Sequence, residues 1–196
     1  MKPTIYIISG CNGAGKTTAS FTILPEILGV HEFVNADEIA KGLSPFQPEK
    51  VNFEAGRIML SRLDELIAQK ADFAFETTLA TRSYLGRIKK ARKQGYRVVM
   101  VYFWLSSVAL AQARVALRVT EGGHNISPPV IKRRYERGLH NLFHLYMDAV
   151  SEWLVVDNSE ERHVLLASQV RGSKPYISEW QKWRKFEATY GKGAKG

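Results

Sequence analysis

Short apolar runs alternate with longer amphipathic stretches along most of the chain. The first run, residues 4–9, is β-branched and almost wholly apolar, which is typical of a strand buried on both faces of a parallel sheet. Further strands are predicted at 33–35, 73–75, 98–103, 153–156 and 163–170, and helices at 16–28, 48–70, 82–94, 108–119 and 128–150. The alternation predicts one α/β domain over residues 1–196, with a three-layer parallel sheet covered by helices on both faces.

A glycine-rich motif follows the first predicted strand directly. Residues 10–17 read G-C-N-G-A-G-K-T and match G-x-x-x-x-G-K-[ST], the Walker A phosphate loop (P-loop). Glycines permit the turns that aim successive N–H groups at phosphate, and the helix N-terminus adds positive charge. Lys16 is expected to reach the β- and γ-phosphates, and the Thr17 hydroxyl to bind Mg²⁺. The residues predicted to bind ATP are Gly10, Asn12, Gly13, Ala14, Gly15, Lys16, Thr17, Thr18 and Arg134. The fold is therefore predicted to be a P-loop NTPase of the nucleotide-kinase type.

Two acidic residues follow neighbouring predicted strands. Asp37 comes just after the second strand and Glu76 at the end of the third. Because the carboxyl ends of parallel strands converge on the ligand crevice, both carboxylates are expected near the γ-phosphate. Asp37 could accept the proton of an attacking hydroxyl, and Glu76 could hold a magnesium-bound water or orient the acceptor. The alternatives are a helix-capping role for Asp37 and a structural role for Glu76.

Several blocks resemble the zeta toxin family of P-loop kinases. They are N-A-D at 35–37, F-E-T-T-L at 75–79, G-G-H-N-I at 122–126 and R-R-Y-E-R at 133–137, and the resemblance covers roughly residues 4–157. It implies that Asp37 is the catalytic base and that Glu76 helps to bind the acceptor. Thr78 and Arg82 are the other residues predicted to bind the acceptor. It also implies a UDP-activated N-acetyl amino sugar, UDP-N-acetylglucosamine, as acceptor. An antitoxin protein is a further candidate partner that the resemblance does not itself imply.

Arginines flank a glycine pair that suits a hinged lid over residues 114–137. Guanidinium groups stabilise the charge that develops on a transferred phosphoryl group. Arg118 and Arg133 are the arginines predicted to act in catalysis, with Arg134 next. The alternative for Arg118 and Arg133 is a role in surface solubility.

The single cysteine, Cys11, lies inside the phosphate loop. One cysteine excludes a disulfide framework and fits a reducing cytoplasm, and the start of the chain shows no leader of secretory length. Because inward N–H groups favour negative charge, the Cys11 thiol is expected to have a lowered pKa and to react when nucleotide is absent. The alternative is an inert, buried thiol.

The net charge of +9 is unevenly spread. Residues 77–120 contain nine basic and no acidic side chains, and the basic tail at about 185–196 is predicted to be flexible. Such basic regions can neutralise phosphates, although a solvated helix face is the alternative. No nucleic-acid module motif and no membrane-spanning apolar run is present, so neither nucleic acid nor membrane is an expected partner.

The sequence therefore predicts a cytoplasmic ATP- and Mg²⁺-dependent kinase that phosphorylates an alcohol group of a small acceptor. Two alternatives remain: a kinase acting on another metabolite, a nucleotide or an RNA end, and a non-catalytic nucleotide-dependent switch.

Overall fold

A computed structural model of the chain describes residues 2–123 and 125–191, without the side chains of Thr22 and Ile23. Within these residues seven strands form one sheet in the order β2-β3-β1-β4-β5-β6-β7. The strands are β1 (Thr4–Gly10), β2 (Phe33–Val34), β3 (Phe73–Thr77), β4 (Arg97–Trp104), β5 (Glu152–Asp157), β6 (Val164–Val170) and β7 (Tyr176–Ile177). Strands β1 to β5 pair in parallel, whereas β6 pairs antiparallel with β5 and β7 pairs antiparallel with β6.

The sheet is therefore mixed, and the prediction of a parallel sheet holds only for its first five strands. The connection from β5 to β6 is too short for a crossover helix, so β6 returns as an antiparallel neighbour.

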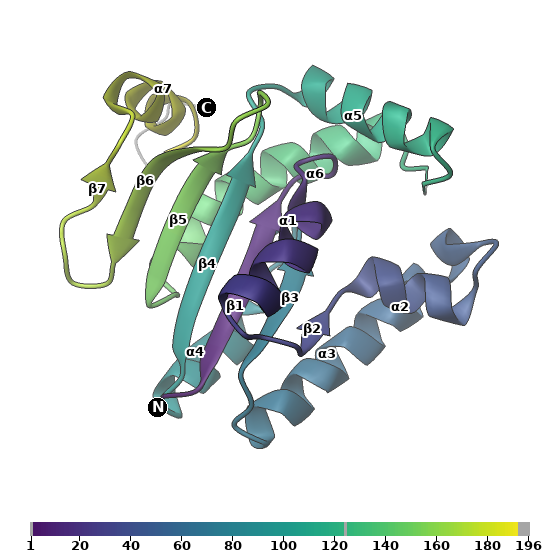
Figure 1. Ribbon diagram of the computed structural model, residues 1–196, viewed down its shortest axis with the longest axis horizontal. Coiled ribbons are helices and arrows are strands. Elements are labelled where there is room, and N and C mark those ends of the chain that lie inside the picture. Colours follow the sequence, from purple (N-terminus) through teal and green to yellow (C-terminus); the bar gives the residue numbers. More distant parts are fainter. Residues whose placement is uncertain (1, 124, 192–196) are drawn as a thin grey trace.

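Helices lie on both faces of this sheet, as predicted. They are α1 (Lys16–Thr22), α2 (Ala36–Leu43), α3 (Asn52–Ala68), α4 (Leu85–Lys93), α5 (Val108–Thr120), α6 (Pro128–Asn141) and α7 (Trp180–Tyr190). Figure 1 shows α1 in front of the sheet, α4 and α6 behind it, and α2 and α3 beyond the β2 edge. None of the helices in the described ranges is both long and apolar enough to cross a membrane.

Three short helical segments extend or precede these helices. Ile23–Ile27 and Leu142–Tyr146 are π-helical, and Pro48–Val51 is a 3₁₀ turn. The helix predicted at 128–150 is thus α6 followed by a π-helical turn, which buries Leu142, Phe143 and Tyr146. π-Helical turns of this kind are often found near functional sites.

The core contains the residues of the predicted buried strands. Ile5 and Ile7 of β1 and Val98, Met100 and Tyr102 of β4 are all at most 2% exposed. These side chains alternate along their strands and pack on the sheet face that α4 and α6 cover. Strand β1 is also apolar on its other face, which lies beneath α1.

The predicted flexible tail at 185–196 is wrong for residues 185–190, because these belong to α7. Trp183 and Phe186 lie one turn apart on that helix and are buried. The Trp183 ring stacks on Trp153 of β5 at a centroid distance of 5.7 Å, and Phe186 meets Trp104 of β4 edge-on at 5.0 Å. This aromatic contact fixes the helix despite its basic surface. Residues 192–196 lie outside the described part of the chain.

Candidate active site

The phosphate loop lies between the end of β1 and the start of α1. Gly13 and Gly15 have φ angles of +79° and +80°, which L side chains rarely adopt, so the loop needs glycine at both positions. Lys16 is buried, and its Nζ donates a hydrogen bond to the Cys11 carbonyl oxygen at 2.9 Å. The loop is therefore curled around the lysine at the head of the helix, as the motif predicts.

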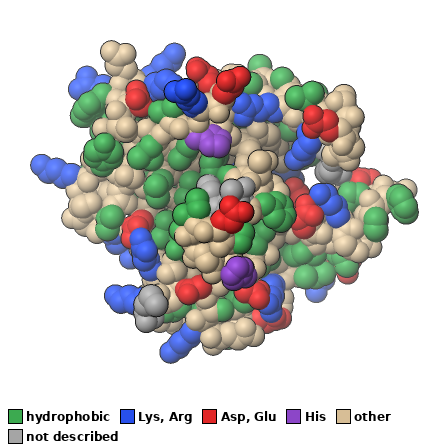
Figure 2. Space-filling model, in the orientation of Figure 1, with side chains coloured by type: hydrophobic (Ala, Val, Ile, Leu, Met, Phe, Trp, Pro, Cys, Tyr) green, Lys and Arg blue, Asp and Glu red, His purple; other side chains and the backbone are tan. Residues whose placement is uncertain are grey.

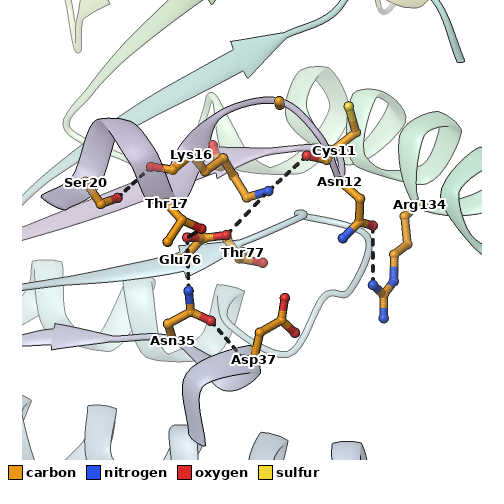
Figure 3. Close-up of polar contacts among 12 residues, drawn as sticks. Cys11, Asn12, Lys16, Thr17, Ser20, Asn35, Asp37, Glu76, Thr77 and Arg134 are labelled. Carbon is orange, nitrogen blue, oxygen red and sulfur yellow. Dashed lines mark hydrogen bonds and ion pairs between the residues drawn. The ribbon is translucent and has the colours of Figure 1, made fainter. Parts of the chain in front are cut away.

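Glu76 lies beside this loop because β3 pairs with β1 in a register that sets Ile8 opposite Glu76. The Thr17 hydroxyl donates to its Oε2 at 2.8 Å, and Lys16 Nζ is 3.5 Å from its Oε1 (Figure 3). Asn35 Nδ2 also donates to Oε2, at 3.0 Å. The carboxylate is thus held by the two residues of the motif that were predicted to meet phosphate and Mg²⁺.

The capping role considered for Asp37 belongs instead to Asn35. Asn35 has extended φ and ψ and its Oδ1 accepts the Asp37 backbone N–H at 2.8 Å, as an N-cap does. Asp37 follows in the first turn of α2, and its exposed side chain forms no hydrogen bond or ion pair with any described residue. Figure 3 shows its carboxylate directed away from α2, to the side where Glu76 and Thr77 of β3 lie.

Two cavities share Asp37. The smaller, about 150 Å³, is lined by Asn12, Lys16, Asn35, Ala36, Asp37, Glu76, Thr77, Thr78, Thr81, Tyr84 and Arg134. The larger, about 300 Å³, is lined by Asp37, Glu49, Asn52, Asn125, Ile126, Ser127, Val130, Arg133 and Arg134. Asp37 and Arg134 line both, so one carboxylate and one guanidinium stand where the two cavities adjoin.

The structure separates the predicted arginines. Arg134 is half-buried and donates to Asn12 Oδ1 at 3.3 Å, while the exposed Arg133 lines the larger cavity. Arg118 and Arg82 line neither of these two cavities. The Arg118 side chain lies against Gly123, where an added Cβ would be 2.6 Å from its Cγ. Position 124, in the middle of the expected lid, lies outside the described residues.

Helix α6 and the π-helical turn after it shape the smaller cavity through the loop after β3, which includes the predicted acceptor-binding residue Thr78. The loop after β3 turns at Leu79, which is buried with φ +55°, and Asn141 Nδ2 donates to its carbonyl oxygen at 2.7 Å. Gly138 lies so close to the Thr78 carbonyl that a Cβ would be 2.5 Å from it. Tyr146 Oη donates to the Thr81 carbonyl oxygen at 2.7 Å. These long-range contacts place Thr78 in the cavity.

Other lining residues were missed or only broadly predicted. Asn125 lies in the G-G-H-N-I block, which was the available signal for it. Glu49 and Asn52 fall in and after a 3₁₀ turn that brings α3 back along α2, and no motif marks them.

The expectation of a reactive Cys11 thiolate is wrong. Burial raises the pKa of the Cys11 thiol to about 11, and the nearby Lys16 charge and a backbone hydrogen bond offset this only in part. The thiol is 2% exposed and therefore stays protonated and shielded at neutral pH.

The sheet order, the phosphate loop at the end of β1 and the acid at the end of β3 define a P-loop kinase fold. The Zeta toxin family profile matches residues 1–170, and the chain belongs to this family. An uncharacterized protein of Haemophilus influenzae is 33% identical over 127 residues, which cover 64% of this chain and 88% of that protein.

Solved structures agree on the fold. A chain of the AvrRxo1-ORF1:-ORF2 complex with ATP has a TM-score of 0.77 at 15% identity, covering 100% of this chain and 66% of its own. The present chain thus spans slightly less than two thirds of that relative. A chain of the Streptococcus pneumoniae PezAT toxin–antitoxin system has a TM-score of 0.69 at 14% identity, covering 100% and 80%. A Sinorhizobium meliloti gluconokinase has a TM-score of 0.54 at 15% identity, covering 81% and 84%.

Proposed function

We propose that this protein is an ATP-dependent kinase that transfers the γ-phosphoryl group to a hydroxyl of a small acceptor. The observation that supports this most is the position of Asp37, an uncommitted carboxylate that lines one cavity with Lys16 and Glu76 and a second cavity beyond them. A phosphate loop alone would serve a switch equally well, whereas a base facing the loop across a cavity suits transfer to an alcohol.

The phosphate loop and its neighbours are the proposed ATP site. Backbone N–H groups of residues 10–18 and the α1 N-terminus would hold the phosphates, and Lys16 would exchange its contacts with Cys11 and Glu76 for phosphate oxygens. Arg134 of α6, already hydrogen-bonded to Asn12 of the loop, would add a second positive charge beside that of Lys16 to neutralise the γ-phosphate.

The oxygens of Thr17 and Glu76 fit Mg²⁺. They lie 2.8 Å apart beside the loop and are hard donors, the kind that this ion prefers over nitrogen or sulfur. Thr17 and Glu76 would hold the ion, which would neutralise negative charge that develops during phosphoryl transfer.

The transfer step assigns Asp37 the role of base. The Asp37 carboxylate accepts the proton of the acceptor hydroxyl while that oxygen bonds to the γ-phosphorus, and the bond from phosphorus to the β–γ bridging oxygen breaks to release ADP. Asn35 fixes the backbone of the base through the helix cap and fixes Glu76 through its amide, so one side chain sets the spacing of both acids.

The larger cavity is the proposed acceptor site. Its lining is mainly polar and includes Glu49, Asn52, Asn125 and Arg133, which suits an acceptor with several hydroxyl groups and an anionic part. Family membership makes UDP-N-acetylglucosamine the first acceptor to test, with Thr78 and Glu76 on the phosphate side. An antitoxin is proposed as a protein partner, on the grounds of family membership and of the likeness to a chain of the PezAT system.

The test is ADP formation by the purified protein with ATP–Mg²⁺, with and without UDP-N-acetylglucosamine and a panel of metabolites. A kinase forms ADP only with an acceptor, which gains one phosphoryl group in mass. ADP formation at one slow rate regardless of acceptor would instead identify a nucleotide switch and overturn the proposal.

Asp37→Asn separates binding from transfer. The variant should bind ATP normally and lose about 10²- to 10⁴-fold in turnover, the usual contribution of a general base. Glu38→Gln is the matched control because Glu38 is the next residue of α2 but pairs with Lys41 at the surface. Full turnover by Asp37→Asn would remove Asp37 from the mechanism.

A further inference from the structure

The turn that follows β5 lies directly against the phosphate loop. Asn158 in this turn is 7% exposed, and its Nδ2 donates to the Ala14 carbonyl oxygen at 2.9 Å. A Cβ on Gly15 would lie only 2.5 Å from the same Nδ2. The loop is therefore shaped to the Asn158 amide, with glycine required where the two are closest.

This contact sets the orientation of one peptide group. A trans peptide directs its C=O and its N–H to opposite sides. Fastening the Ala14 oxygen to Asn158 therefore turns the Gly15 N–H away from Asn158. In a phosphate loop the N–H groups must converge on the ligand. By holding the Ala14 carbonyl oxygen on the side away from the ligand, Asn158 keeps the Gly15 N–H directed toward it.

Helix α5 braces the turn from a second side. The Arg114 guanidinium donates to the carbonyl oxygens of Asn158 and Ser159, at 2.7 and 3.0 Å. Gly13 packs on the same arginine, since an added Cβ there would be 3.2 Å from Arg114 Cβ. Arg114 was expected in the lid, but its guanidinium contacts the turn that supports the loop.

The C-terminal helix α7 holds the turn from a third side. Asp157 is buried, and its carboxylate accepts the Ser159 N–H at 3.0 Å and Lys182 Nζ of α7 at 3.0 Å. Burial raises the pKa of the Asp157 carboxyl, but the hydrogen bonds from Ser159 and Lys182 outweigh it and hold the pKa below its usual value. The carboxylate is thus charged at neutral pH and tied to α7, which Figure 1 shows at the same end of the sheet as α5.

We propose that Asn158 is a positioning residue of the phosphate loop and that α7 keeps it in place through the Lys182–Asp157 ion pair. Helix α7 lies beyond residues 1–170, which the family profile covers, so Lys182 comes from outside the family match, whereas Asn158 and Asp157 lie within it. The inference rests on the proposed function only in requiring that the loop bind nucleotide.

Variants of Asn158 test the first part. Asn158→Ala, which loses one buried hydrogen bond, should weaken ATP–Mg²⁺ binding about tenfold. Asn158→Asp has nearly the same shape but sets a carboxylate oxygen against the Ala14 oxygen, so its loss should exceed that of Asn158→Ala. Unfolding midpoints without nucleotide distinguish a positioning role from a structural one, because positioning predicts loss of affinity in proteins that remain folded.

Variants of Lys182 test the second part. Lys182→Met removes the charge and should weaken ATP–Mg²⁺ binding about threefold, a modest figure because the pair is partly exposed, and Lys182→Arg should restore it. Lys185→Met is the matched control. Lys185 lies one turn further along α7 than Lys182 but has no ion pair among the described residues.

The experiment is calorimetric titration of each purified full-length protein with ATP–Mg²⁺, accompanied by thermal unfolding. A wild-type protein that binds no ATP would refute the proposed function itself. Wild-type binding together with equal binding by Asn158→Asp would overturn the positioning role. Equal binding by Lys182→Met and Lys185→Met would overturn the role of α7, and this pair decides the outcome if both Asn158 variants fail to fold.

Discussion

Replacing Glu76 by glutamine tests how the phosphate loop is held together. The carboxylate is 9% exposed and has two occupied sides: Oε1 lies 3.5 Å from Lys16 Nζ, while Oε2 accepts from Thr17 and Asn35. Glutamine has one acceptor oxygen and one NH₂ group. Whichever way its amide turns, the NH₂ faces a donor, either the Lys16 ammonium or the Asn35 amide.

The size of the effect follows from the buried charge that remains. At 3.5 Å and an effective dielectric constant of about 20, the Lys16–Glu76 attraction is about 5 kcal/mol before desolvation is counted. Lys16 keeps its hydrogen bond to the Cys11 carbonyl, which offsets part of the loss. We therefore expect Glu76→Gln to lower the free energy of unfolding by about 3 kcal/mol, the lower end for breaking a buried pair.

The assay is urea unfolding without nucleotide, followed by ATP titration over a range of Mg²⁺ concentrations. Glu65→Gln is the control, because Glu65 pairs with Arg62 at the surface and such pairs contribute at most about 1 kcal/mol. If both variants unfold within 0.5 kcal/mol of each other, on the order of the variation among surface substitutions, Glu76 does not hold the loop. Unchanged Mg²⁺ dependence of ATP binding would also remove Glu76 from the metal site.

Three other buried side chains, Cys11, Asn35 and Phe186, give further predictions. Because burial raises the pKa of the Cys11 thiol to about 11, Cys11 should react with iodoacetamide at pH 8 far more slowly in the folded protein than in urea, and equal alkylation rates would contradict its burial. The free energy of unfolding should also fall as the pH rises toward 11, because the unfolded thiol ionises first. Asn35→Ala should lower the free energy of unfolding by about 1–2 kcal/mol through loss of the α2 cap, and Asn35→Ser, which retains a capping oxygen, should lose less. Phe186→Ala should cost about 3–5 kcal/mol in urea unfolding, whereas the exposed Trp180→Ala should change little; equal effects would mean that α7 is not packed as described.

The parts of the fold set by local rules were predictable. The apolar run of β1, the glycine pattern of the loop and the amphipathic start of α1 each depend on neighbours in sequence, so strand, loop and helix follow from residues 4–22 alone. Helix α2 shows the limit. Asn35 and Asp37 are both residue types that cap helices, and residue type alone does not set where so short a helix begins, so Asp37 was weighed as the cap that Asn35 in fact provides.

Long-range contacts account for the differences. Nothing local specifies that Trp183 and Phe186 of a basic segment contact Trp153 and Trp104 of the sheet. Likewise Arg114 and Arg118, one turn apart on α5, were equivalent in sequence. In the fold Arg114 contacts the turn after β5, whereas Arg118 lies beside Gly123.

The same division explains why family membership identifies the fold and leaves the acceptor to experiment. The phosphate loop is recognised by spacing because one short segment forms it. The proposed acceptor cavity is assembled from α2, the 3₁₀ turn, α3, the segment before α6, and α6 itself, so its shape depends on how these segments pack. Helix α6 positions the strained Leu79 loop of the smaller cavity and also carries Arg133 and Arg134. A change in the packing of α6 would therefore alter both cavities together. A relative could therefore keep every motif residue and still take a different acceptor, and substitutions facing Gly138 and Asn141 are where that difference would arise.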